Sequence, residues 1–163
     1  MEFGGRYLFS APRDRVWAGL NDADVLKAAI PGCSRLEWTG DSTLECEIKV
    51  NFGLVQPTFT GDLELRDVEP AARYTLAGRG RGGLLGKAEA AADIALVDAP
   101  GGTELTFTAD GGADGGIMKL GRAVIGNSAQ RIIDGFFERI GEAMGTTVTP
   151  LSAVPSRDPQ PSS

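Results

Sequence analysis

The chain has 163 residues, of which 42% are hydrophobic and 23% are charged, and its formal net charge is −6. This length and composition favour one soluble globular domain with a buried core. The negative charge argues against nucleic-acid binding. The sequence contains no histidine, which removes the commonest general base and the commonest metal ligand together. We therefore expect no catalytic site and no metal site, and we predict that the protein is not an enzyme.

The expected location of the chain follows from its apolar runs. No run has the length of a membrane span. The N-terminal residues lack the charged and then apolar order of a secretory signal. The chain is therefore expected in the cytoplasm, with any membrane contact peripheral.

The first part of the chain predicts one strand followed by two short helices. Apolar or small residues alternate with polar ones over residues 3–9, which is typical of a half-buried strand. Ser10 is a suitable N-cap and Pro12 suits a first helical turn, so a short helix is predicted next. A second short helix, capped at Asn21-Asp22, is expected to end at Pro31-Gly32.

Six further segments alternate between apolar and polar residues, and turn signals separate them. With the first strand, they predict about seven antiparallel strands in a sheet that has one polar face. The six segments are 36–38, 44–52, 55–65, 74–80, 88–96 and 105–109. Cys33 and Cys46 fall on opposite parities of this pattern, which predicts two free thiols on opposite faces of the sheet.

A glycine-rich stretch in this region contains a weak nucleotide-binding motif. Gly78, Gly80 and Gly83 match the spacing GxGxxG. A dinucleotide site needs a strand before the motif, a helix after it and a parallel strand beyond. Residues 87–97 are alanine-rich and just compatible with a helix, but the flanking segments alternate as antiparallel strands do. We therefore interpret the stretch as a glycine-rich hairpin.

One long helical pattern, Gly115–Met144, follows a glycine-rich hinge at Gly111–Gly116. No other segment is long enough to cover the apolar face of the sheet. The predicted fold is therefore α+β, with a curved sheet wrapped around a C-terminal helix. From Gly145 onward the chain is rich in Pro, Ser and Thr and has no periodicity. The predicted domain therefore spans residues 1–144, and residues 145–163 are predicted to be a disordered tail.

Two stretches predict an internal apolar cavity. The inward-facing residues of the middle strands are small, and so are those of the first half of the helix. Because protein interiors rarely leave space empty, a bound apolar ligand would account for this pattern. The alternative is that the glycines permit curvature and the helix simply sits closer. The small strand residues are Gly61, Gly78, Gly80, Ala88, Ala90 and Ala92, and the expected ligand contacts are Phe59, Leu63, Tyr74, Leu76, Phe107, Met118, Gly121, Ile125, Ser128, Ile132 and Phe136.

Several stretches together resemble a known family. The opening FSAPRDRVWAGLNDADVLKAAIPGC (residues 9–33) is similar to the start of CoxG proteins, the family of the carbon monoxide dehydrogenase G subunit. The similarity continues through Phe59-Thr60-Gly61, the Gly80–Gly86 turn and Phe136-Phe137-Glu138-Arg139, and covers about residues 1 to 144. The chain thus resembles the CoxG family, which belongs to the START-like (SRPBCC) superfamily.

The resemblance implies a helix-grip fold, in which a seven-stranded antiparallel sheet surrounds a C-terminal helix and encloses an apolar cavity. It also implies an accessory role for a molybdenum hydroxylase of the carbon monoxide dehydrogenase type, including recruitment to the cytoplasmic membrane and binding of a membrane quinone. Some members carry a hydrophobic C-terminal extension that anchors them. The polar tail of this chain departs from that pattern.

Residues and resemblance together predict a non-enzymatic carrier with no covalent cofactor. It is expected to hold menaquinone or ubiquinone between sheet and helix and to present it to the hydroxylase at the inner face of the cell membrane. Tyr74 and Ser128 are the expected hydrogen-bond partners of the quinone head. One alternative is a START-like enzyme of the cyclase or hydratase type that acts on a hydrophobic small molecule. A third interpretation is an interaction protein with a filled core.

Overall fold

The computed structural model describes residues 1–153, which form one eight-stranded sheet together with α-helices and short 3-10 helices. The elements in chain order are β1 (Glu2–Phe9), α1 (Arg13–Leu20), α2 (Ala23–Ala29), β2 (Cys33–Trp38), β3 (Thr43–Lys49), β4 (Thr58–Glu69), β5 (Arg73–Arg81), the 3-10 helix η1 (Gly83–Leu85), β6 (Lys87–Ala99), β7 (Gly102–Asp114), the 3-10 helix η2 (Gly115–Leu120), α3 (Arg122–Met144) and β8 (Val148–Ala153).

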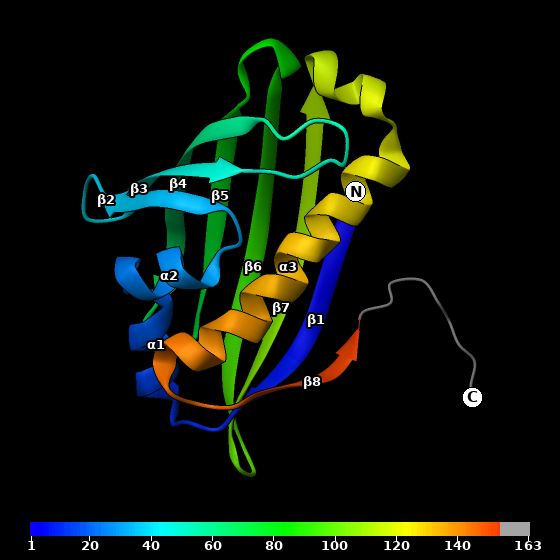
Figure 1. The fold of residues 1–163 in the computed structure, drawn as a ribbon. Helices are drawn as coiled ribbons and strands as arrows, with labels where there is room; N and C mark the ends of the chain where they lie inside the picture. Colours follow the sequence, from blue (N-terminus) through cyan, green and yellow to red (C-terminus); the bar gives the residue numbers. More distant parts are fainter. Residues whose placement is uncertain (154–163) are drawn as a thin grey trace.

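The sheet is antiparallel and open, with the strand order β2-β3-β4-β5-β6-β7-β1-β8. It curves around α3, which crosses one face of the sheet diagonally, while α1 and α2 lie beside the C-terminal end of α3 (Figure 1). This arrangement confirms the predicted α+β helix-grip fold. The glycine-rich stretch is a hairpin as predicted, because Lys87–Ala99 is strand β6 and pairs antiparallel with β5.

The predicted boundary after residue 144 is wrong, because an eighth strand follows α3. Gly145 ends the helix in the left-handed conformation, with φ = 71°. Val148–Ala153 then pairs with β1 as strand β8. Pro150 is tolerated there because β8 is an edge strand, where a missing N–H breaks no second ladder. The remaining residues of the predicted tail, 154–163, lie outside the described part of the chain.

The long helix begins later than predicted. Gly121 has φ = +91°, a positive value that L-residues rarely adopt, and α3 starts only at Arg122. The preceding residues form η2, which is a separate turn with its own direction. The predicted hinge is also displaced, since Gly111 and Gly112 are part of strand β7. The interruption at Gly121 decides which residues α3 can present to the sheet.

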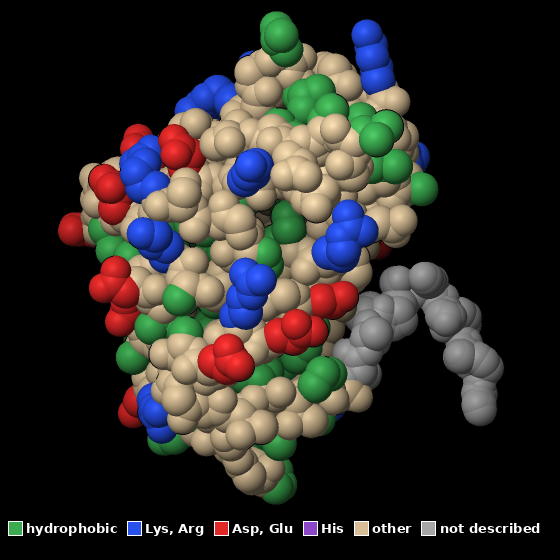
Figure 2. All heavy atoms as spheres, viewed as in Figure 1, with side chains coloured by type: hydrophobic (Ala, Val, Ile, Leu, Met, Phe, Trp, Pro, Cys, Tyr) green, Lys and Arg blue, Asp and Glu red, His purple; other side chains and the backbone are tan. Residues whose placement is uncertain are grey.

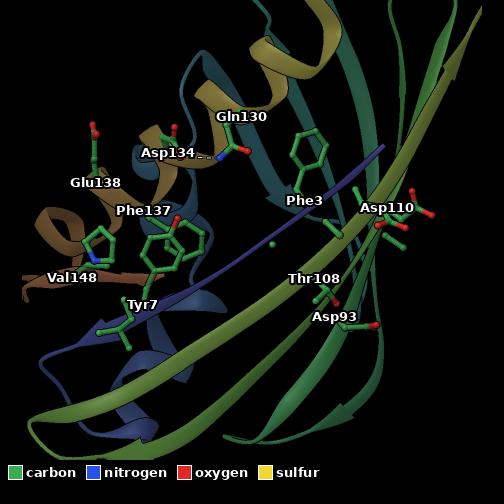
Figure 3. A pocket seen from close by; sticks show the side chains of 16 residues that line it. Phe3, Tyr7, Asp93, Thr108, Asp110, Gln130, Asp134, Phe137, Glu138 and Val148 are labelled. Atoms are coloured by element: carbon green, nitrogen blue, oxygen red, sulfur yellow. Dashed lines mark hydrogen bonds between the residues drawn. The ribbon is translucent and has the colours of Figure 1, made fainter. Parts of the chain in front are cut away.

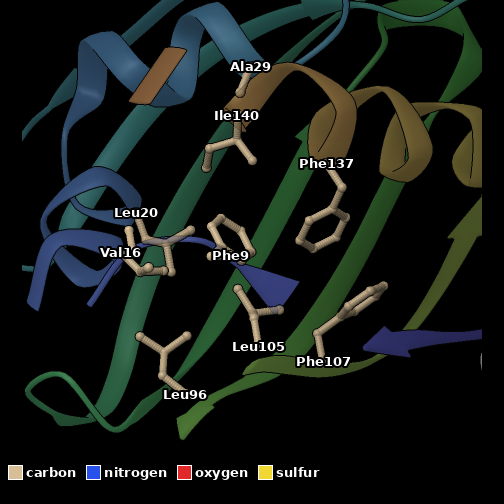
Figure 4. Close-up of a cluster of buried hydrophobic side chains, with 10 residues drawn as sticks. Phe9, Val16, Leu20, Ala29, Leu96, Leu105, Phe107, Phe137 and Ile140 are labelled. Atoms are coloured by element: carbon tan, nitrogen blue, oxygen red, sulfur yellow. The ribbon is translucent and has the colours of Figure 1, made fainter. Parts of the chain in front are cut away.

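The hydrophobic core is divided into two clusters. The first, called the base core, lies under α1, α2 and the C-terminal half of α3 (Figure 4). The second, called the edge core, lies between α2 and strands β2 to β4. The base core consists of Phe9, Ala11, Val16, Leu20, Ala29, Leu96, Leu105, Phe107, Phe137 and Ile140, and the edge core of Leu36, Leu44 and Cys46. Neither cluster includes a residue from the N-terminal half of α3.

The two cysteines lie on the same face of the sheet, contrary to the prediction. An irregularity in the pairing of β2 and β3 falls between Cys33 and Arg35, and it reverses the parity of the strand at that point. Cys33 therefore packs against the edge core that contains Cys46. Both side chains are free thiols.

Burial of Cys46 predicts a pH-dependent stability. Burial, with the nearby Cys33, raises the pKa of the Cys46 thiol from 9.0 to about 11. Between these pH values the unfolded chain releases the thiol proton while the folded chain keeps it, so stability falls as the pH rises. We expect the urea midpoint to decline from pH 9 to about 11 and Cys46→Ser to show a smaller decline. An identical decline in this variant would contradict the assignment.

Candidate functional site

The inner face of strands β4 to β7 has a region almost without side chains, called here the bare patch. The strand register places small residues side by side in two neighbouring rows. No member of either row has more than a methyl group as its side chain. The rows are Gly61–Gly80–Ala88–Ala113 and Gly78–Ala90–Gly111.

Two predicted site residues cover the β4–β5 side of the bare patch. A Cβ atom on Gly78 would lie 2.8 Å from Leu63 Cδ2, and one on Gly80 would lie 3.6 Å from the ring of Phe59. The β6–β7 side is more open. Ala90 is exposed although it faces α3, and Ala88 is only half-buried. The unfilled part of the patch therefore lies over β6 and β7.

Helix α3 crosses this side of the sheet diagonally (Figure 1). Ile125 and Ile132 are half-buried, and neither belongs to a core cluster. Leu76 is likewise half-buried, in the row of inner-face residues next to the bare patch. A helix that sat closer to the sheet would have buried Ala90 against these side chains. The exposure of Ala90 thus favours a space between sheet and helix over the alternative of closer packing.

A second opening lies beside β1. A hollow of about 1070 Å³ runs past this strand and has residues on both sides of the sheet. Figure 3 shows Phe3, Tyr7 and Phe137 on the side of α3, whereas Thr108 and Asp110 point away on the other side. Because β1 and β7 separate the two groups, one ligand cannot contact both. We call the part on the α3 side the β1 wedge; it is lined by Phe3, Tyr7, Ala109, Gln130, Asp134, Phe137 and Val148.

The β1 wedge adjoins the bare patch. Phe3 pairs with Ala109, which pairs with Ala92, so these three residues form the row next to Ala90 and Gly111. Successive rows on one face of a sheet are about 7 Å apart. The β1 wedge and the bare patch therefore occupy neighbouring rows on the same face of the sheet.

An aromatic cluster forms one wall of the wedge. The rings of Tyr7 and Phe137 are stacked with centroids 3.8 Å apart, and Phe107 stacks on Phe137 at 5.4 Å. Phe136 meets Phe137 edge-on at 5.1 Å. Phe107 and Phe136, two of the predicted ligand contacts, thus both pack against the ring of Phe137. Phe137 itself was not among the residues predicted for the inward face of the helix. The inward parity of Phe3 and Tyr7 was visible in the sequence, but the wedge beside them was not.

Ser128 on α3 is hydrogen-bonded to the loop between β3 and β4. Its hydroxyl donates to the carbonyl oxygen of Asn51 at 3.0 Å. Arg131 Nη2 donates to the same carbonyl at 3.3 Å and to Ser128 Oγ at 3.2 Å. Residues 50–57, between β3 and β4, are therefore fastened to the helix. With these bonds made, Ser128 is poorly placed to serve a ligand.

Tyr74 is a buried side chain whose hydroxyl is unpaired within residues 1–153. It is 5% exposed and its ring packs edge-on against Trp17 at 5.3 Å. Its hydroxyl has no hydrogen-bond partner among residues 1–153. Burial raises the pKa of Tyr74, so the hydroxyl stays protonated and can act only as a neutral donor or acceptor. Tyr74 pairs with Ile94, one row away from Leu76 and Ala92.

Two of the predicted ligand contacts lie outside helix α3. Met118 lies in η2 and is 48% exposed. Gly121 is the residue that separates η2 from α3, and a Cβ atom added to it would meet nothing within 4 Å. Both were assigned to the helical face because the periodicity was extended through Gly121. The positive φ at that glycine changes the direction of the chain and removes both residues from the face.

The described residues show neither a metal cluster nor a membrane-spanning helix. Among residues 1–153, no group of three or more Cys, Asp or Glu side chains is placed to hold a metal ion. Within the same residues, no helix combines the length and apolarity needed to cross a bilayer.

Solved structures share this architecture. A conserved protein from Geobacillus kaustophilus is 25% identical, with a TM-score of 0.80 over 91% of this chain and 99% of its own. The aromatase/cyclase Zhui from Streptomyces sp. R1128 is 19% identical, with a TM-score of 0.60 over 88% and 93%. The protein TTHA0849 from Thermus thermophilus is 17% identical, with a TM-score of 0.64 over 88% and 97%. These likenesses confirm the START-like fold.

Sequence comparison identifies the family. A search of proteins of curated function found no match. The family described as the carbon monoxide dehydrogenase G subunit (CoxG) matches residues 5–145, which is most of the chain. The family name implies an association with a carbon monoxide dehydrogenase system. On this match and on the shared fold, the chain belongs to the CoxG family.

Proposed function

We propose that this protein is a non-catalytic carrier of a membrane quinone, menaquinone or ubiquinone, for a molybdenum hydroxylase of the carbon monoxide dehydrogenase type. In this role it links the hydroxylase to the cytoplasmic membrane and its quinone pool. The observation that carries the proposal is the exposed Ala90 on the inner face of the sheet, in a patch of small residues under α3. A carrier needs such space, whereas a protein that only docks a partner does not.

The lining of the space suits both parts of a quinone. An isoprenoid tail gains about 0.8 kcal/mol for each methylene buried against apolar side chains such as Ile125 and Ile132. The quinone ring carries carbonyl oxygens, which accept hydrogen bonds. The Tyr74 hydroxyl is a protonated donor two rows from the Gly78–Ala90 row of the bare patch, with Leu76 and Ala92 between, and it has no partner among residues 1–153. We therefore place the head near Tyr74 and the tail along the bare patch.

The polar groups around the space support carriage more than catalysis. The chain has no histidine, and burial keeps Tyr74 protonated rather than basic. Asp134 lines the wedge but is hydrogen-bonded to Gln130 at 2.9 Å. One structural relative is an aromatase/cyclase by name, so conversion of a bound molecule by this protein would favour the enzymatic alternative.

Lipid extraction tests the proposal. Protein purified from a quinone-producing host should release menaquinone or ubiquinone on organic extraction, detected by mass spectrometry, and lipid-depleted protein should take up added quinone at about one per chain. The added quinone should be recovered chemically unchanged. If neither quinone is found or taken up, or if the quinone is converted, the carrier function is wrong.

Tyr74→Phe should separate binding from stability. Removing a buried hydroxyl without a partner should stabilise the ligand-free protein, by up to about 1–3 kcal/mol. The same change should weaken quinone binding about 2–10-fold, because one neutral hydrogen bond is lost. Thermal denaturation and quinone titration measure the two effects. Tyr7→Phe is the matched control and should alter neither strongly. A less stable ligand-free Tyr74→Phe protein would contradict this role.

A further inference from the structure

The exposed apolar side chains gather at one end of the molecule. Three segments meet there, residues 50–57, 82–87 and 115–124, and we call them the tip. Five of the nine large hydrophobic side chains that are exposed among the described residues belong to the tip. Leu54 and Leu84 are fully accessible, at 102% and 100%. The five are Leu54, Val55, Leu84, Met118 and Val124.

The three segments are held together as one surface. Gly116 lies against the backbone of Leu84 and Leu85, so η1 and η2 pack on each other. The ring of Phe59 covers Gly82 and meets Phe52 edge-on, with centroids 6.4 Å apart. The bonds from Ser128 and Arg131 described above fasten the first segment to α3. Figure 1 shows these loops at the end of the molecule where α3 begins.

The charge of the tip is opposite to that of the whole chain. The three segments contain Lys87, Lys119 and Arg122 and no acidic residue, although the formal net charge of the chain is −6. The nearest acidic residue in sequence is Asp114, which precedes the third segment. Figure 2 shows exposed hydrophobic side chains at the upper end of the molecule, which is the end of the tip in Figure 1.

Protruding leucines beside lysine and arginine suit a lipid surface. Leu54 and Leu84 stand on separate segments, the loop between β3 and β4 and the helix η1, so a protein partner would need a matching pit for each of them. A fluid bilayer accepts such side chains without a matching shape, and anionic headgroups attract the three basic residues. The combination favours a bilayer over a protein partner.

We propose that the tip docks on an anionic phospholipid bilayer, with Leu54 and Leu84 inserted and Lys87, Lys119 and Arg122 at the headgroups. The row Gly80–Ala88–Ala113 of the bare patch lies directly next to η1 and η2. Docking would therefore place the bare patch close to the membrane, from which a lipophilic molecule could enter it. This last step rests on the proposed carrier function, whereas docking itself does not.

The test is flotation of the full chain with vesicles of equimolar phosphatidylglycerol and phosphatidylcholine. Leu54→Ser/Leu84→Ser should lower vesicle partitioning at least about 10-fold, because both inserted side chains are lost. Val68→Ser/Val97→Ser is the matched control. Val68 and Val97 are 43% and 55% exposed and lie near the ends of strands β4 and β6 that are far from the tip. Their replacement should leave vesicle partitioning unchanged. High salt, or vesicles of phosphatidylcholine alone, should weaken wild-type binding.

Quinone titration in the absence of vesicles distinguishes the two proposals. All of the variants should bind a short-chain, water-soluble menaquinone analogue as the wild type does. If Leu54→Ser/Leu84→Ser floats like the wild type, or if pure phosphatidylcholine binds equally well, the docking proposal is wrong. If flotation behaves as expected but no protein binds the analogue, the carrier function is wrong and docking stands.

Discussion

Ala90→Phe should abolish quinone uptake without unfolding the protein, and Ala91→Phe should leave uptake intact. The two alanines are neighbours on β6, and both are exposed, but they point to opposite faces of the sheet. Ala90 faces α3 between Gly78 and Gly111, so a phenyl ring there occupies the proposed ligand space. We expect affinity to fall about 100-fold or more, since each tenfold loss needs only about 1.4 kcal/mol.

The measurement is quinone titration of lipid-depleted protein, with thermal denaturation of the same samples. Phenylalanine favours strands more than alanine does, so neither substitution should lower the melting temperature strongly. Ile125→Trp fills the same space from the helix side and should act like Ala90→Phe. Equal binding by all three variants would show that the space is not where the ligand lies. A collapse of stability in Ala90→Phe alone would show that the bare patch is ordinary core.

Ile140→Ala should destabilise the protein by about 2–5 kcal/mol while leaving quinone affinity unchanged. Ile140 is 0% exposed in the base core, between α1, α2 and the sheet (Figure 4). Its removal leaves a cavity that the packed neighbours cannot close. For a chain of this size the melting temperature should fall by roughly 2–4 °C per kcal/mol.

Ile132→Ala is the matched substitution on the same helix. Ile132 is half-buried and lies outside both core clusters, so its loss should cost only about 1 kcal/mol. It belongs to the helical face that is predicted to contact the ligand, and quinone affinity should therefore fall. Urea denaturation and quinone titration of the two variants measure stability and binding separately. If Ile132→Ala proves as destabilising as Ile140→Ala, the distinction between the packed base core and a less densely packed N-terminal half of α3 is wrong.

The sequence alone determined the class of fold and the chemistry of the inner face. Strict alternation assigned the strands, and one long helical pattern identified the element that the sheet surrounds. Because alternation is a local property of the backbone, it also showed that Gly78, Ala90 and their neighbours share a face. The absence of histidine is likewise visible without coordinates.

The positions where these patterns are interrupted follow from tertiary contacts and are not visible in the sequence. The positive φ of Gly121 removed Met118 from the helical face, and the irregularity after Cys33 moved that thiol to the face of Cys46. Strand β8 forms because the free edge of β1 offers it hydrogen bonds, and its own sequence has no strand periodicity. The β1 wedge and the tip are made by segments far apart in the chain. No local pattern reports such contacts, since they depend on how the curved sheet places α3.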